Sequence, residues 1–307
     1  MNLSEYASKK IGFIQGHRSC SGCGMPIVAR SVMAQVADGK VVVSNATGCM
    51  EVTSTIYPQS SWDVPYIHNT FENAAATISG VETAFRALFK KGKIKDNYKF
   101  IAFGGDGGTY DIGLQSLSGA LERGHDFTYV CYDNQGYMNT GGQRSGSTPM
   151  GANTSTAPAG KVQQGKTEWK KDLVRICAAH NIPYVAQASV SNWADLLSKA
   201  KKAVETKGPA VLVVLSPCVF LWKIDSSKTI EVGKLAYETC FWPLYEIENG
   251  EYKLNYDPKD KKKPIEEFFK LQGRFKHLLL PENAELLKEI QNHIDKDWER
   301  LKRLAEQ

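Results

Sequence analysis

An apolar run leads directly into a glycine-rich turn at Lys99-Phe100-Ile101-Ala102-Phe103-Gly104-Gly105-Asp106-Gly107-Gly108. The run at 99–103 is short and apolar, which predicts a buried strand. The segment that follows at 111–123 carries leucines spaced along one helical face, which predicts a helix. A strand that passes through glycines into a helix is a typical unit of an α/β sheet, and its turn offers free backbone N–H groups.

The same alternation extends outward from this unit along most of the chain. Further apolar runs predict buried strands at 40–44, 127–132, 183–187 and 210–215. Amphipathic stretches between them predict helices at 26–37, 71–91, 168–180 and 192–206. We therefore expect an α/β fold with a mostly parallel sheet flanked by helices on both faces.

Two segments depart from this pattern. Residues 139–161 are rich in Gly, Ser, Thr, Asn and Pro without an apolar period, which predicts a long functional loop. After residue 250 the composition becomes charged and then helical, so we expect a domain at 1–250 and a C-terminal helical extension at 251–307. The extension is either a solvated helical tail or a surface that contacts another subunit.

The bulk composition excludes several classes of protein. The formal charge of +5, from 38 basic and 33 acidic residues, is too small to indicate nucleic-acid binding. No apolar stretch approaches the roughly 20 residues that a membrane-spanning helix needs. The first residues, Met1-Asn2-Leu3-Ser4-Glu5, lack the features of a secretory signal, so we expect a cytoplasmic protein with reduced cysteines.

The turn at 104–108 has the chemistry of a site for phosphate and a divalent cation. Glycines allow close approach of the backbone to a phosphate, and Asp106 offers a hard oxygen ligand. Asn134 follows 28 positions later at the end of the next predicted strand. Because adjacent parallel strands end at the same edge of a sheet, we expect Asp106, Asn134 and the main chain of Gly136 to bind one Mg²⁺.

Four of the seven cysteines are candidate metal ligands. Cys20 and Cys23 form a C-x-x-C among glycines, Cys49 follows the first predicted strand, and Cys218 follows the last. Four thiolates suit either a structural zinc or a 4Fe-4S cluster, and their spacing leaves both open. The remaining three cysteines are predicted to be small buried hydrophobic residues without a function: Cys131, Cys177 and Cys240.

Gly-Asp-Gly followed at this distance by Asn is the pattern of thiamine-diphosphate enzymes. Together with the four cysteines, it resembles the beta subunits of the 2-oxoacid:ferredoxin oxidoreductase family, and it looks most like the pyruvate-type members over nearly the whole chain. The similarity is carried by residues 16–24, 46–52, 56–58, 65–69, 71–75, 104–113, 117–125, 132–134, 137–141 and 216–218. The resemblance implies a thiamine-diphosphate-binding fold.

The resemblance also implies roles for individual residues. It assigns Cys20, Cys23, Cys49 and Cys218 to a 4Fe-4S cluster, and Asp106, Asn134 and Gly136 to magnesium. It places the main chain of Met25 and Cys49 against the thiamine, and Asn139 against the reacting substrate. The other residues expected to line the cofactor belong to the two motifs themselves: Gly105, Gly107, Gly108, Gln135, Tyr137 and Met138.

The implied activity is oxidative decarboxylation of pyruvate to acetyl-coenzyme A and CO2, with electrons passed through the cluster to ferredoxin. The family places the activating glutamate on a partner chain, although Glu51 and Glu72 are candidates by location, so the chain is expected to work only within a hetero-oligomer. Oxalate or another short 2-oxoacid remains open as the substrate. Two rival hypotheses are a non-oxidative thiamine-dependent lyase subunit with structural zinc and a non-catalytic cysteine scaffold. His17, His68 and Arg144 receive no role.

Overall fold

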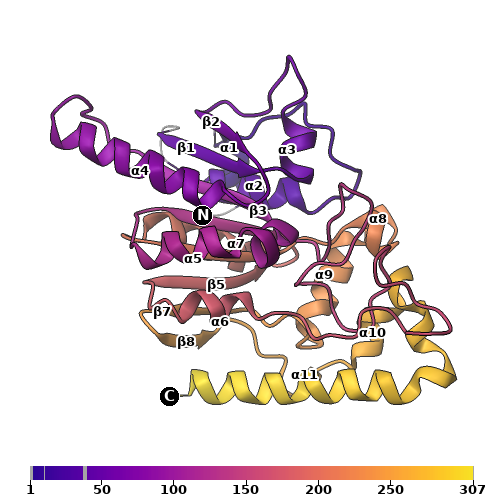
Figure 1. Ribbon diagram of the computed structural model, residues 1–307. Helices are drawn as coiled ribbons and strands as arrows, with labels where there is room; N and C mark the ends of the chain where they lie inside the picture. The colour runs from indigo at the N-terminus through magenta and orange to yellow at the C-terminus, as the bar shows by residue number, and fades with distance from the viewer. Residues whose placement is uncertain (1–2, 10, 37–39, 307) are drawn as a thin grey trace.

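The computed structural model describes residues 3–9, 11–36 and 40–306, and it is built around one continuous sheet (Figure 1). The described strands lie in the order β2-β1-β3-β4-β6-β5-β7-β8. All neighbours from β2 to β5 pair in parallel, while β7 and β8 add an antiparallel hairpin. The strands are β1 (Val41–Ala46), β2 (Tyr66–Asn69), β3 (Lys99–Gly105), β4 (Thr128–Asp133), β5 (Tyr184–Ser189), β6 (Ala210–Leu215), β7 (Tyr245–Glu248) and β8 (Glu251–Leu254).

The predicted α/β fold with a mostly parallel sheet is confirmed, and all five predicted strands are present. The sequence analysis missed β2, β7 and β8, each of which has only four residues. Polar residues occupy half or more of β2, β7 and β8, so none of them forms an apolar run. Their backbone hydrogen bonds to neighbouring strands, which no local pattern reveals, define them as strands.

Helices cover both faces of the sheet. Along β3, Phe100 and Ala102 face one hydrophobic core, and Ile101 and Phe103 face the other. The first core is covered by α4, α5, α6, α9, α10 and α11, and the second by α2 and α7. The helices are α1 (Leu3–Ser8), α2 (Met25–Met33), α3 (Cys49–Ser54), α4 (Ala74–Lys90), α5 (Leu114–Glu122), α6 (Leu173–Ala178), α7 (Trp193–Glu205), α8 (Val219–Trp222), α9 (Thr229–Glu238), α10 (Ile265–Lys270) and α11 (Ala284–Ala305).

Several helix boundaries differ from their predictions. Helix α2 ends at Met33, earlier than the predicted end at Ala37, which lies outside the described residues together with Met1 and Asn2. Helix α6 begins only at Leu173, because the Asp172 side chain accepts a hydrogen bond from the N–H of Arg175 and caps the helix there. The predicted loop at 139–161 contains no helix or strand.

The C-terminal segment packs against the main body of the protein. Strand β8 joins the sheet, and α11 buries Ile290, Ile294 and Trp298 in the same core as α4 and α5. Figure 1 shows α11 along the β8 side of the sheet. The β7–β8 hairpin spans residue 250, and the domain boundary expected there stays a prediction. Among the described residues, no helix is long and apolar enough to cross a membrane.

Candidate cofactor site

A crevice lies where the strand order reverses between β1 and β3. The chain continues from β1 to β2 on one side, whereas β3 and β4 follow on the other, so the segments after β1 and β3 separate. Ligands of open α/β sheets bind at such switch points, outside the carboxyl ends of the strands. The crevice is lined by Thr47, Gly48, Cys49, Phe71, residues 105–108, Tyr132, Asn134 and residues 136–140.

The glycine turn after β3 begins a helix earlier than predicted. A π-helix (η2, Gly107–Ile112) starts directly after Asp106, where the sequence analysis placed the helix start near Asp111. The N–H of Gly113 donates to the carbonyl of Gly108 at 2.7 Å. This hydrogen bond joins residues five positions apart, which is typical of a π-helix. A Cβ at Gly107 would lie only 2.4 Å from the Tyr137 ring. Larger residues therefore cannot replace this glycine without moving the wall of the crevice.

Three oxygen-bearing groups from two adjacent strand ends converge beside this turn. The Asn134 amide lies 2.8 Å from Asp106 Oδ1 and 2.9 Å from the carbonyl oxygen of Gly136. With its nitrogen on that side, the amide donates to both atoms. With its oxygen there, three oxygens meet and require a cation between them. Carboxylate, amide and carbonyl oxygens are the ligands that Mg²⁺ prefers, so these residues fit the predicted magnesium site.

Asp106 is fully buried, and its charge is poorly compensated by the protein. It accepts hydrogen bonds from the N–H of Asn134 at 3.2 Å and from the hydroxyl of Ser145. Burial and then the nearby charge of Asp133 raise the pKa of Asp106 well above its usual range. Burial also raises the pKa of Asp133, although hydrogen bonds from Ser147 and Tyr110 oppose the shift. Two buried carboxylates in one place favour the binding of a divalent cation.

A buried arginine from the C-terminal segment supports the loop that follows β4. Arg274 is fully buried and donates from Nη2 to Gln135 Oε1 at 2.6 Å. Its guanidinium stacks 3.9 Å from the Trp222 ring, and Trp222 Nε1 donates to the carbonyl of Asn134 at 2.8 Å. Gln135 has a positive φ of 65° and accepts Thr148 Oγ1 on its carbonyl. The sequence analysis missed this support, which fixes Gln135 and, through Trp222, the main chain of Asn134.

We expect Arg274→Met to destabilise the protein substantially. The substitution leaves the buried Gln135 Oε1 without a donor and removes the stacked guanidinium, at a cost of about 2–4 kcal/mol in the free energy of unfolding. Urea unfolding of the purified chain measures this change. Arg303→Met, at an exposed position of α11, serves as the control and should change stability by less than about 0.5 kcal/mol. Equal effects of the two substitutions on stability would contradict the proposed role of Arg274 in supporting the loop after β4.

The four predicted cluster cysteines lie in neighbouring segments. The N–H of Gly24 donates to the carbonyl of Pro217 at 3.4 Å, which places the C-x-x-C loop against the segment of Cys218. Burial and then the charges of Cys218, Cys23 and Cys20 together raise the pKa of Cys49 to about 12. Burial, with smaller contributions from Cys218 and Cys20, raises the pKa of Cys23 to about 12. These electrostatic interactions indicate that the thiols lie near one another.

A zinc ion and a 4Fe-4S cluster require different arrangements of these thiols. Among the described residues, no three side chains of His, Cys, Asp and Glu converge closely enough to bind one metal ion. A zinc ion needs all four sulfurs about 2.3 Å from one point. A 4Fe-4S cluster binds each thiolate to a different iron and therefore holds them farther apart. The other three cysteines are buried, as predicted: Cys131, Cys177 and Cys240.

Two further predicted site residues, Asn139 and Met25, differ in their position relative to the crevice. Asn139 is exposed at the rim of the crevice, next to Met138 and Tyr137. Met25 is buried at the start of α2 and does not line the crevice, although its backbone hydrogen-bonds the Cys23 thiol.

The remaining candidates have contacts within the chain. Glu51 lies 3.5 Å from His68 Nε2 and Glu72 accepts a hydrogen bond from Thr70. His17 stacks on Phe13, with the ring centroids 5.3 Å apart, and Arg144 is exposed.

Comparison with known proteins identifies the family. Residues 46–214 match the family described as "Thiamine pyrophosphate enzyme, C-terminal TPP binding domain". The pyruvate synthase subunit PorB of Thermotoga maritima is 56% identical over 98% of this chain and 94% of the relative. The chain belongs to the PorB family. Another PorB, from Methanocaldococcus jannaschii, is 53% identical over 92% of this chain and 94% of the relative.

Two further comparisons concern another related subunit and a solved structure. The ketoisovalerate oxidoreductase subunit VorB of Pyrococcus abyssi is 45% identical over 96% of this chain and 93% of the relative. A solved 2-oxoglutarate:ferredoxin oxidoreductase from Magnetococcus marinus has a TM-score of 0.57 at 21% identity, over 71% of this chain and 77% of that chain. The latter likeness supports the fold alone. The resemblance inferred from the motifs is therefore confirmed: this chain is a subunit of a 2-oxoacid:ferredoxin oxidoreductase.

Proposed function

We propose that this chain carries the thiamine diphosphate, the magnesium ion and a 4Fe-4S cluster of a pyruvate:ferredoxin oxidoreductase. The observation that carries the proposal is the convergence of Asp106, Asn134 and Gly136 in the same crevice as Cys49. In this proposal, the diphosphate-binding site and a ligand of the cluster lie side by side. Loss of CO2 would leave an electron pair on the cofactor, and a cluster accepts electrons one at a time. Because the two sites would be adjacent, no other electron carrier is needed between them.

Different residues of the crevice would bind different parts of the cofactor. The backbone of Gly105, Gly107 and Gly108 approaches the diphosphate, and the three oxygen groups bind its magnesium. Gly136, Tyr137 and Met138 line the same crevice, whereas Gln135 is buried behind it, and the backbone of Cys49 at the start of α3 would face the thiamine. Thiamine supplies the carbanion that attacks the 2-oxoacid, whereas the protein orients it and excludes water.

Asn139 is proposed to bind the substrate. Its side chain is exposed at the rim of the crevice, where a 2-oxoacid would approach the cofactor. A neutral amide donor can stabilise the negative charge that develops on the carbonyl oxygen without altering the charge of the site. The turn at residues 137–143 fixes its position, because the N–H of Gly142 donates to the carbonyl of Tyr137 at 2.8 Å.

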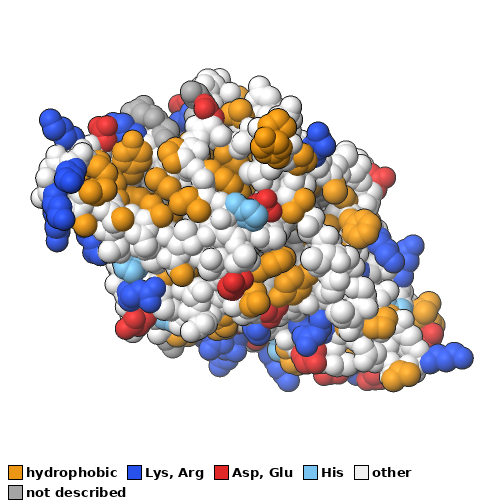
Figure 2. All heavy atoms as spheres, turned by 45° about the horizontal axis from the view of Figure 1, so that its top comes forward, with side chains coloured by type: hydrophobic (Ala, Val, Ile, Leu, Met, Phe, Trp, Pro, Cys, Tyr) orange, Lys and Arg blue, Asp and Glu red, His pale blue; other side chains and the backbone are white. Residues whose placement is uncertain are grey.

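The surface near the crevice supports assembly with partner subunits. Large exposed hydrophobic side chains lie on segments that follow β1, β3 and β6: Val52, Tyr57, Ile112 and Phe220. Tyr57 is 94% exposed. The face turned forward in Figure 2 is largely hydrophobic or uncharged, with basic side chains toward its margins. Such a surface fits a partner chain that supplies the activating glutamate, while ferredoxin and coenzyme A would be bound by the assembled complex.

Pyruvate is the proposed substrate because the PorB relatives of Thermotoga maritima and Methanocaldococcus jannaschii, at 56% and 53% identity, are more similar to this chain than the VorB relative at 45%. We expect the purified chain alone to show no reduction of methyl viologen with pyruvate and coenzyme A. The complex with its partner subunits should reduce viologen, and faster with pyruvate than with oxalate, 2-oxobutyrate, 2-oxoglutarate or ketoisovalerate. Turnover by the isolated chain would contradict the proposed division of the active site, and a preference for another acid would correct the substrate.

A further inference from the structure

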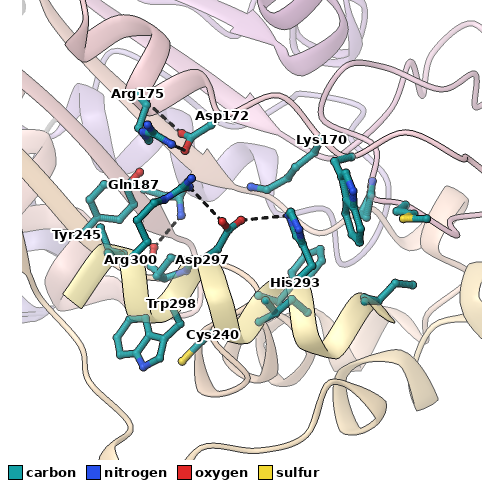
Figure 3. Close-up of a pocket in the computed structure, with 18 of the residues that line it drawn as sticks. Lys170, Asp172, Arg175, Gln187, Cys240, Tyr245, His293, Asp297, Trp298 and Arg300 are labelled. Carbon is teal, nitrogen blue, oxygen red and sulfur yellow. Dashed lines mark hydrogen bonds and ion pairs between the residues drawn. The ribbon is translucent and has the colours of Figure 1, made fainter. Parts of the chain in front are cut away.

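A second cavity lies between α11 and the sheet, away from the cofactor crevice (Figure 3). Its volume is about 290 Å³, and it shares no lining residue with the crevice. Its walls come from the segment before α6, from β5, from the chain between α9 and β7, and from α11. Strand β5 and helix α11 both contribute buried side chains to the first hydrophobic core, so the packing of the fold fixes these two walls.

Aromatic and aliphatic side chains make up much of the wall. Trp298 and Tyr245 line the cavity, and leucines and isoleucines of α11 complete its apolar surface. Trp169 stacks on His293 with ring centroids 3.7 Å apart and an interplanar angle of 9°, which fixes another side. An apolar wall of this kind favours a ligand with an aromatic or branched body.

Charged groups on the wall leave one basic side chain in excess. Asp297 pairs with both His293 at 3.2 Å and Arg300 at 3.1 Å, and Asp172 lies 4.0 Å from Arg175. Lys170 instead lies 4.4 Å over the Trp242 ring, and no described carboxylate forms an ion pair with it. Figure 3 shows its side chain extending into the cavity. A single negative charge on a ligand would therefore find an unpaired cation at this site.

A buried amide provides a second polar contact. Gln187 is only 5% exposed and lines the cavity from β5. Its Nε2 donates to the carbonyl of Pro243 at 2.8 Å, while its side-chain oxygen has no hydrogen-bond partner within the described chain. This oxygen is accessible from the cavity, so a water molecule or a ligand can donate a hydrogen bond to it. The hydroxyl of a protonated or hydroxylated ligand, or a water molecule beside the ligand, would satisfy it.

We propose that this cavity binds a small monocarboxylate with an aromatic or branched apolar body. The carboxylate lies against Lys170, and the apolar body packs on Trp298. A volume of about 290 Å³ corresponds to roughly ten water molecules, the size of an acid with about ten non-hydrogen atoms. The excess of one positive charge selects a monoanion over a cation of the same shape. The site is independent of the cofactor crevice and does not require the proposed function.

Ligand-observed NMR on the intact complex tests the proposal with phenylacetate and isovalerate as probes. Both acids should bind saturably, with Kd of about 1 mM or tighter. Phenethylamine, a cation of similar shape, and inorganic phosphate, an anion without an apolar body, should not bind. Lys170→Gln should weaken phenylacetate binding about tenfold, whereas Lys170→Arg should retain it. Lys296→Gln, at an exposed position of α11 outside the cavity, should leave binding unchanged.

Two outcomes would overturn the proposal. The first is absence of saturable phenylacetate binding to the intact complex, as expected if a partner side chain fills the cavity. The second is equal binding by wild type and Lys170→Gln, which would place the ligand elsewhere. Thermal unfolding of each variant distinguishes a lost contact from a lost fold, and Trp298→Leu provides an independent test of the apolar wall. This variant should weaken phenylacetate more than isovalerate because it removes an aromatic surface.

Discussion

Asp106→Ala is expected to abolish magnesium-dependent binding of thiamine diphosphate to the assembled complex. Asp106 is the one charged group among the three that converge on the proposed metal site. Its removal leaves two neutral oxygens, which bind Mg²⁺ far more weakly. We expect at least about a hundredfold loss of cofactor affinity, equivalent to about 2.7 kcal/mol.

Thermal unfolding of the complex gives a second measurement of the same change. A ligand that binds only the folded state raises the unfolding temperature, so magnesium and thiamine diphosphate should raise it for wild type but not for Asp106→Ala. Asp260→Ala, which removes an exposed carboxylate from the C-terminal charged run, is the matched control and should respond like wild type. Normal cofactor binding by Asp106→Ala would contradict the proposed metal site.

Cys218→Ala is expected to remove most of the iron from the chain and to abolish viologen reduction. One iron of the proposed cluster would lose its thiolate, and the buried remaining thiols would have to deprotonate without full compensation. Iron and sulfide analysis, together with electron paramagnetic resonance of the dithionite-reduced complex, measures the loss. Cys177→Ala should keep the cluster, because Cys177 is buried in α6. Stoichiometric zinc in wild type, without iron, would favour the rival lyase hypothesis.

Local sequence predicted that Asp106 and Asn134 would lie close together, because both residues follow directly from strand ends. Asp106 ends the glycine turn after β3, and Asn134 follows β4, so the parallel pairing of two adjacent strands brings them together. The alternation of apolar runs and amphipathic segments was sufficient to predict that pairing. The exact start of the helix was not predictable, because the π-turn at 107–112 depends on the close approach of Tyr137 and Phe71 to the glycines.

The support of the site depends on contacts that sequence patterns do not encode. Arg274 lies 139 positions after the Gln135 that it contacts, in a segment with no motif. Ser145 and Ser147 hydrogen-bond Asp106 and Asp133, but they lie in a loop where serines are common. No local signal distinguishes Arg274, because Lys270 and Lys276 lie close to it in the same segment. Only the tertiary structure indicates which loop it stabilises.

The most direct test of the central claim is anaerobic freeze-quench electron paramagnetic resonance of the intact complex mixed with pyruvate in the absence of ferredoxin. We predict that the signal of a reduced 4Fe-4S cluster appears on mixing in wild type and is absent in both Asp106→Ala and Cys218→Ala. Decarboxylation of pyruvate with release of acetaldehyde, and with no reduced cluster at any time, would contradict the account.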